Sequence, residues 1–205
     1  MIQVKICGIT NYDDAQAALD YGADAIGFIF SHRSRRFVSS KKVYSIISKL
    51  PPFAMTVGVF VNSSREEIES AVKNSGIKMV QLSGDESFSF VNSLSYPKIK
   101  AIHIKRNSNA EELKKYKNTR FLLDSSVSYG GSGVQADWEI CRKIARKYPI
   151  ILAGGLTSQN IIEAIEYVQP VAVDVSSGVE TVGNRKDIKK MREFISIVKD
   201  YKGKV

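Results

Sequence analysis

A cysteine ends the first apolar run of the chain, in the stretch VKICGIT of residues 4–10. Cys7 is followed at once by Gly8, a residue that lets the backbone approach a ligand closely. A cysteine in a core is usually an inert small hydrophobe. A thiol at the open end of a strand, beside such a backbone, could instead be a catalyst.

Other apolar runs of the chain also end in polar residues. Asp124 ends the run FLLD, and the arginines of SHRSRRF follow the second apolar run. Glycines and serines follow two later runs, in ILAGGL (residues 151–156) and AVDVSSGVE (172–180). A guanidinium can hold a substrate carboxylate by two hydrogen bonds, and glycine-rich turns can bind phosphate through backbone N–H groups. These residues indicate a site for a small anionic substrate.

Strand and helix patterns alternate along the chain, and these elements must position the polar residues. Apolar, β-branched segments predict strands at Gln3–Cys7, Ala25–Ile29, Thr56–Phe60, Met79–Leu82, Lys100–Ile104, Phe121–Asp124, Ile150–Ala153 and Val171–Val175. Helical periodicity predicts helices at Asp13–Tyr21, Ser40–Leu50, Arg65–Asn74, Ala110–Tyr116, Asp137–Lys147, Gln159–Tyr167 and Lys186–Lys199. The stretch Glu86–Leu94 has a weaker helical signal.

Eight strand–helix units favour an α/β protein that forms a (β/α)₈ TIM barrel. An open doubly wound sheet is the alternative, but it would need a glycine-rich fingerprint in the first turn, and CGIT is not one. No linker or composition break interrupts the chain, so we expect one domain over residues 1–205. The loop SSVSYGGSG of residues 125–133 is longer than most strand-to-helix connections and favours a binding loop.

In such a barrel the chemistry takes place where the strands end. Alternation along the first strand puts Lys5 and Cys7 on the same side, with the thiol toward the barrel mouth. Asp174 of the last strand also faces inward, and the first and last strands of a closed barrel are neighbours. We therefore expect that Lys5 and Asp174 could pair inside the barrel.

The composition also excludes several classes of function. The chain has a net charge of +9, two cysteines and no run of about 18 apolar residues. We therefore expect a cytoplasmic protein with no membrane partner and no disulfide framework. The basic charge fits solvated helix surfaces or a field that steers an anionic substrate. Basic and aromatic residues do not alternate as in nucleic-acid-binding motifs, so we expect no nucleic-acid partner.

The segments KICGIT, GADAIGFIF, RSRRFV, PPFAMTVGVFVN, VQLSG, LLDSSVSYGGSG, ILAGGL and AVDVSSGVE resemble phosphoribosylanthranilate isomerase. They match in order over nearly the whole chain. The resemblance implies an Amadori rearrangement in tryptophan biosynthesis, in which N-(5-phosphoribosyl)anthranilate becomes 1-(o-carboxyphenylamino)-1-deoxyribulose 5-phosphate. It implies no cofactor and no metal.

The same resemblance assigns roles to individual residues. Cys7 corresponds to the general base and Asp124 to the general acid. The substrate-binding residues that we expect are Arg36 for the anthranilate carboxylate, together with Gly154, Gly155, Asp174, Ser177 and Gly178. Ser83 is a departure, because the family usually has a histidine in the motif QLHG where this chain has QLSG.

Acid–base chemistry requires that both groups leave their ordinary protonation states. One hypothesis is that a partly desolvated mouth raises the pKa of Asp124, and that Lys5 lowers the pKa of Cys7 toward the thiolate. The alternative is that Lys5 and Asp174 only fill the barrel, and that the thiol is tuned when substrate binds. The residues alone leave both open.

Other functions have less support. The histidine-pathway sugar-phosphate isomerase resembles this chain in its phosphate loops, but it has an aspartate in place of Cys7, which also disfavours a bifunctional enzyme. A catalytically idle barrel that binds phosphate or nucleic acid is supported only by the basic charge. The apolar stretch PPFAM could meet a second copy, so the chain is expected to be a monomer or a homodimer.

Overall fold

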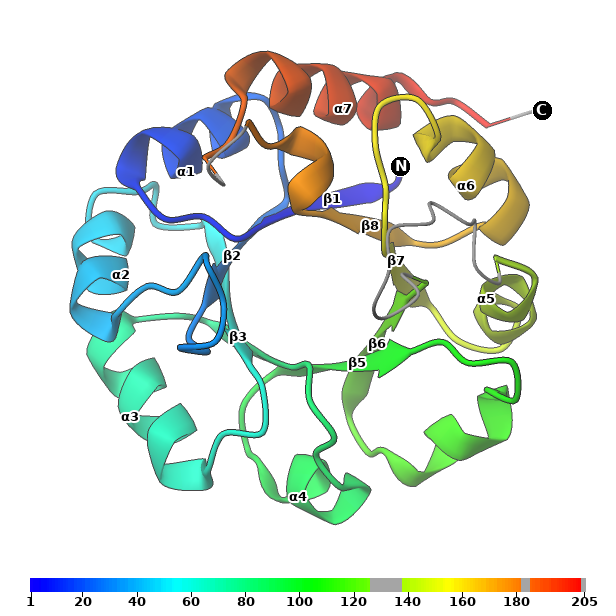
Figure 1. Ribbon diagram of the computed structural model, residues 1–205, viewed down its shortest axis with the longest axis horizontal. Helices are drawn as coiled ribbons and strands as arrows, with labels where there is room; N and C mark the ends of the chain where they lie inside the picture. Colours follow the sequence, from blue (N-terminus) through cyan, green and yellow to red (C-terminus); the bar gives the residue numbers. More distant parts are fainter. Residues whose placement is uncertain (126–137, 182–184, 204–205) are drawn as a thin grey trace.

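The computed structural model describes residues 1–125, 138–181 and 185–203. Eight parallel strands form a closed barrel in chain order, and β8 pairs with β1. The strands are β1 (Gln3–Cys7), β2 (Ala25–Ile29), β3 (Met55–Phe60), β4 (Met79–Leu82), β5 (Lys98–His103), β6 (Thr119–Asp124), β7 (Ile150–Ala153) and β8 (Ala172–Val175). Figure 1 shows the strands as an inner ring with helices around it. The predicted (β/α)₈ barrel is confirmed.

Helical segments connect the strands and cover the barrel from outside (Figure 1). The α-helices are α1 (Tyr12–Asp20), α2 (Ser40–Ile47), α3 (Arg65–Ser75), α4 (Phe88–Ser93), α5 (Trp138–Ala145), α6 (Ile161–Val168) and α7 (Ile188–Asp200). Two 3₁₀ segments, η1 (Ala110–Lys115) and η2 (Ser177–Val179), complete the set within the described residues.

The segment after β5 differs from the expected α-helix. It forms the 3₁₀ helix η1, which is only six residues long. The side chain of Asn109 accepts hydrogen bonds from the first N–H groups, and Tyr116 returns to extended backbone at the other end. So short a segment forms few i to i+4 bonds, and the tighter i to i+3 turn is common in such connectors. Strand β5 also begins two residues earlier than predicted, at Lys98.

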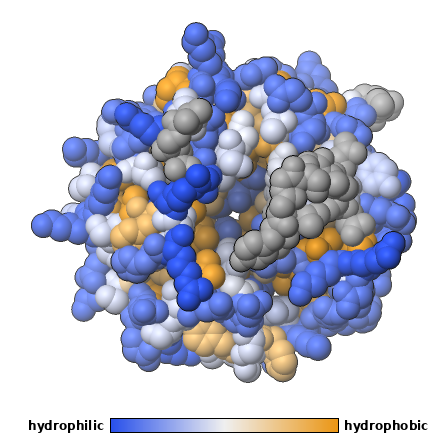
Figure 2. Space-filling view, in the orientation of Figure 1, coloured by the Kyte–Doolittle hydropathy of each residue, from blue (hydrophilic) through white to orange (hydrophobic). Residues whose placement is uncertain are grey.

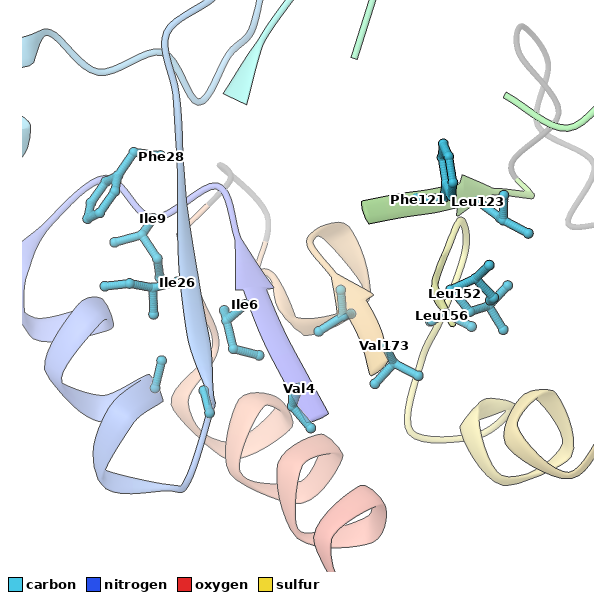
Figure 3. Packing of buried hydrophobic residues seen from close by; sticks show 14 of the residues in the cluster. Val4, Ile6, Ile9, Ile26, Phe28, Phe121, Leu123, Leu152, Leu156 and Val173 are labelled. Atoms are coloured by element: carbon cyan, nitrogen blue, oxygen red, sulfur yellow. The ribbon is translucent and has the colours of Figure 1, made fainter. Parts of the chain in front are cut away.

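Side-chain alternation along the strands separates two apolar regions. One set of strand residues packs outward against the helices, and Figure 3 shows Val4 and Ile6 of β1 with Phe121 and Leu123 of β6 in this layer. A smaller cluster of inward-facing residues consists of Val57, Ile99, Ala101, Leu122 and Ala153. Because the side-chain period of a strand is two, Lys5 and Cys7 face the interior while their neighbours face the helices.

The longest helix among the described residues, α7, has 13 residues. A helix needs about 20 apolar residues to cross a bilayer. Within the described ranges, no helix is long and apolar enough to do so.

Candidate active site

The ring of strands surrounds a hollow, and Figure 2 shows hydrophilic residues, coloured blue, along part of its border. Three inward side chains from neighbouring strands meet in the interior. Lys5 Nζ donates a hydrogen bond to Asp174 Oδ1 at 2.8 Å, and both residues are buried. Lys5 and Asp174 are also register partners between β1 and β8. The predicted pairing inside the barrel is confirmed.

Cys7 lies at the end of β1, next to this ion pair, with 6% of its surface exposed. Burial raises the pKa of the Cys7 thiol above its ordinary value. The Lys5 ammonium opposes this effect, while the Asp174 carboxylate adds to it. Lys5 therefore lowers the pKa of the thiol, as the hypothesis states, but burial outweighs this effect and leaves the pKa raised. Desolvation of the sulfur is the largest cause, and the Asp174 carboxylate offsets part of the effect of the Lys5 ammonium.

Gly27 of β2 gives room to these groups, and sequence reasoning missed it. Gly27 is the register partner of Cys7. A methyl group at Gly27 would lie 2.9 Å from Cys7 Sγ and 3.2 Å from Lys5 Cε and Nζ. Carbon contacts are optimal at about 3.5–4.0 Å, so a side chain at position 27 would displace the thiol and the ammonium.

Arg36 forms a two-point ion pair with Glu180. Its Nε donates to Glu180 Oε1 at 2.7 Å, and its Nη2 donates to Oε2 at 2.6 Å. Lys186 Nζ donates to the same carboxylate at 2.7 Å. Burial opposes ionisation of Glu180, but the hydrogen bonds from Arg36 and Lys186 outweigh it and lower the pKa of the carboxyl group.

This pairing bears on the role expected of Arg36. The guanidinium is oriented by a protein carboxylate in the same two-point geometry that a substrate carboxylate would use. A guanidinium has five N–H donors, so three remain outside the two bonds to Glu180. Glu180 was not singled out from the sequence, because 144 residues separate it from Arg36.

Gly8 explains how the Arg36 side chain reaches this position. Gly8 has a φ of +79°, in the left-handed region that disfavours other residues. A methyl group here would lie 2.5 Å from Cδ of Arg36. The glycine after Cys7 therefore lets the arginine side chain pass directly over the backbone.

The loops after β7 and β8 have the backbone features expected of a phosphate site. Gly154 and Gly155 have positive φ values of 97° and 63°, and the space beside Gly155 is open. Ser177 and Gly178 begin η2, and the first N–H groups of a helix lack partners within it. A methyl group at Gly178 would collide with the backbone carbonyl of Leu156, so the two loops lie against each other.

Asp124 ends β6, and its side chain is 26% exposed. Its register partner on β5 is His103. His103 Nδ1 lies 3.6 Å from Asp124 Oδ2, and Nε2 lies 3.2 Å from the backbone oxygen of Ser83. Sequence reasoning missed His103, although its place at the end of a predicted strand was a usable signal. The imidazole of His103 therefore lies next to Ser83, whose own side chain in the motif QLSG is a hydroxyl.

One predicted segment and one cavity are not part of the candidate site as the structure describes it. Apart from Ser125, the predicted binding loop of residues 125–133 lies outside the described residues. A cavity of about 460 Å³ is lined by residues near the starts of the strands, including Gln3, Met55 and Met79. The starts of the strands lie at the opposite end of the barrel from Cys7 and Asp124, so this cavity is not the candidate site.

Comparisons with known proteins agree with this geometry. Residues 4–197 match the family model described as N-(5'phosphoribosyl)anthranilate (PRA) isomerase. An N-(5'-phosphoribosyl)anthranilate isomerase of Pelobacter propionicus is 46% identical over 202 residues, which cover 98% of this chain and 97% of the relative. The enzyme of the same name from Geobacter sulfurreducens is 42% identical over 203 residues, or 98% of this chain and all of the relative.

Solved structures give the same result. The crystal structure of phosphoribosyl anthranilate isomerase from Thermotoga maritima has a TM-score of 0.88 and 38% identity, over 98% of this chain and 100% of that one. A second isomerase structure, in complex with reduced 1-(o-carboxyphenylamino)-1-deoxyribulose 5-phosphate, has a TM-score of 0.85 and 35% identity over the same shares of the two chains. The chain therefore belongs to the N-(5'-phosphoribosyl)anthranilate isomerase family.

Proposed function

We propose that this chain converts N-(5-phosphoribosyl)anthranilate to 1-(o-carboxyphenylamino)-1-deoxyribulose 5-phosphate by general acid–base catalysis, as a step of tryptophan biosynthesis. Membership of the family supports the reaction. The observation that carries the mechanism is the position of Cys7 and Asp124 at the C-terminal ends of two strands of one barrel. Chemistry in such barrels takes place at this end.

Asp124 acts as the acid and Cys7 as the base. Asp124 gives a proton to the furanose ring oxygen, and the bond from this oxygen to C1 breaks as the anilino nitrogen forms a C1 iminium. Cys7, as the thiolate, takes the proton from C2, and the electrons of that bond neutralise the iminium. The resulting enolamine tautomerises to the ketone as C1 gains a proton and the C2 hydroxyl loses one.

The buried thiol must lose its proton before it can act. Since the pKa of Cys7 is raised in this structure, few molecules hold a thiolate before substrate binds. The iminium formed at C1 places a positive charge next to the sulfur, and such a charge favours the thiolate. This supports the interpretation that the thiol is tuned by substrate. Asp174 then serves mainly to hold Lys5, since a carboxylate would repel a phosphate group.

The substrate lies across the barrel mouth in this proposal. Gly154, Gly155, Ser177 and Gly178 bind the phosphate through backbone N–H groups, as the open space beside Gly155 supports. Arg36 binds the anthranilate carboxylate through the donors that Glu180 leaves free. The substrate class is therefore a small anionic sugar phosphate.

The test is the loss of phosphoribosylanthranilate fluorescence, measured on the purified protein and three variants. Cys7→Ser and Asp124→Asn should lower kcat by about 10²–10⁴-fold, the range that a general base or acid contributes. Their affinity for inorganic phosphate, measured by calorimetry, should not change. Cys141→Ser is the matched thiol control, because Cys141 is buried in α5, and it should keep its kcat.

Two results would contradict the proposal. An inactive wild-type protein would refute the reaction. If the wild type is active, a Cys7→Ser variant that kept most of the wild-type kcat would refute the assignment of the base but not the reaction.

A further inference from the structure

The imidazole of His103 lies between the end of β4 and the proposed acid on β6. Its Nε2 faces the backbone oxygen of Ser83 at 3.2 Å, and its Nδ1 faces Asp124 Oδ2 at 3.6 Å. A carbonyl oxygen only accepts hydrogen bonds, so Nε2 carries a proton. In the neutral ring, Nδ1 then has a lone pair directed at the carboxyl group.

This arrangement determines how many protons the two side chains hold. A neutral imidazole beside an ionised carboxylate would place two acceptors face to face. One proton removes the conflict, either on Nδ1, as imidazolium and carboxylate, or on Asp124, as imidazole and carboxylic acid. Catalytic hydrogen bonds are often long without substrate and shorten when it binds, so 3.6 Å is a reasonable separation for such a pair.

We propose that His103 is a positioning residue that shares one proton with Asp124 and returns a proton to this carboxyl group in each turnover. The inference rests on the proposed role of Asp124 as the acid. In the form with the proton on Asp124, the carboxylic acid gives it to the ring oxygen, which leaves a carboxylate beside a neutral imidazole. The neutral imidazole then takes a proton from water, and the pair returns to its starting state.

The surroundings of His103 fit this exchange. Its side chain is 42% exposed, more than that of Asp124, so it is the member of the pair with better access to water. The hydrogen bond with Asp124 raises the pKa of His103, with partial burial and the Lys100 ammonium acting against it. Lys100 is itself paired with Glu86 at 2.8 Å, which weakens its effect. Among the described residues, Asp124 and Lys100 are the charged groups that act on this imidazole.

Ser83 cannot perform the same task. Its hydroxyl accepts a hydrogen bond from Gln81 Nε2 at 3.0 Å, and an aliphatic hydroxyl does not gain or lose a proton near neutral pH. The backbone oxygen of Ser83 instead orients the His103 ring. The imidazole beside the acid therefore comes from β5 in this chain.

The first experiment tests the pair by NMR titration of the histidine rings. The chain has two histidines, His32 and His103, so a His32→Gln variant assigns both signals. In wild type His103 should titrate above the ordinary histidine pKa of about 6.5. In Asp124→Asn its titration should move to lower pH, because the neutral amide does not stabilise the imidazolium. An unchanged titration would overturn the shared proton.

The second experiment tests the role in turnover. His103→Gln keeps an N–H donor for the Ser83 oxygen, but its amide does not gain or lose a proton near neutral pH. We expect kcat to fall by about ten- to a hundredfold, less than for loss of the acid itself, with KM within about twofold. The pH optimum of kcat should move to lower pH, because Asp124 alone holds its proton only in more acidic solution.

The outcomes separate the two proposals. An inactive wild type refutes the proposed function. An active wild type with a His103→Gln variant of equal kcat and pH profile refutes the role of His103. A variant with lower kcat but the wild-type pH profile would show that His103 only positions the Asp124 side chain and exchanges no proton with it. This result also overturns the inference. Thermal unfolding of each variant, together with His103→Asn, identifies any loss of activity caused by misfolding.

Discussion

Gly27→Ala should lower kcat while the protein stays folded, because its methyl group would enter the space that the thiol of Cys7, the proposed base, occupies. Gly27 does not have a positive φ, so alanine meets no backbone penalty there. The methyl carbon would lie 2.9 Å from Cys7 Sγ, whereas contacts are optimal at about 3.5–4.0 Å. The sulfur must therefore move by roughly 0.6–1 Å.

This displacement sets the expected magnitude. A misplacement of about 1 Å can lower a rate about 10²-fold, so we expect kcat to fall by about ten- to a hundredfold. Overpacking a core costs about 1–3 kcal/mol. For a chain of this length, each 1 kcal/mol lowers Tm by about 2–4 °C, so the variant should still be folded at the assay temperature.

The assay combines kcat from substrate fluorescence with Tm from circular dichroism. Gly58→Ala is the matched control, because a methyl group on this β3 glycine would collide with Ile77 and not with Cys7 or Lys5. The control should lose stability and keep kcat. The reasoning would be refuted if Gly27→Ala had the wild-type kcat, or if Gly58→Ala lost as much kcat as Gly27→Ala.

Three further predictions concern the charged groups of the site. Lys5→Met should raise the pKa of Cys7 and Asp174→Asn should lower it, because the ammonium favours the thiolate and the carboxylate opposes it. Thiolate absorbance against pH measures the pKa in each variant, and titration curves equal to that of the wild type would exclude the coupling. Arg36→Met should raise KM by about tenfold or more with a smaller change in kcat, since a charged hydrogen bond contributes about 1.5–3 kcal/mol; steady-state kinetics check this, and an unchanged KM would contradict it. Glu180 has a lowered pKa in the folded protein, so its stabilising effect is present above the unfolded pKa of about 4.3 and is lost as the pH falls through the folded value. The free energy of unfolding should therefore fall more steeply in acid for wild type than for Glu180→Gln, as urea titrations at several pH values would show.

The order of elements in this chain is a local property, and the sequence was enough to predict it. Apolar runs of period two and amphipathic segments of period 3.6 depend on residues close together in the chain. They predicted all eight strands of the barrel, most within a residue of their observed bounds. Prediction failed for η1, where six residues between two caps leave the choice between α and 3₁₀ turns to small differences in energy.

Some features of the candidate site could likewise be predicted from the sequence, and others could not. Motifs predicted Cys7 and Asp124 as the candidate base and acid, which stays a prediction. Alternation with barrel closure predicted the pairing of Lys5 with Asp174, because period two determines which side chains face inward. Alternation does not determine which inward residues from distant strands come into contact. The contact between Arg36 and Glu180 depends on how the loops close over the barrel.

Strand register decided which further residues lie beside Cys7 and Asp124. It placed Gly27 opposite Cys7 and His103 opposite Asp124, and a shift of one residue would have turned those side chains to the other face of the sheet. The pKa of the thiol also required the tertiary structure, because it depends on burial and on how close Lys5 and Asp174 each lie to the sulfur. The sequence by itself thus determined which groups are available for proton transfer, and the closed barrel decided their neighbours and therefore their protonation.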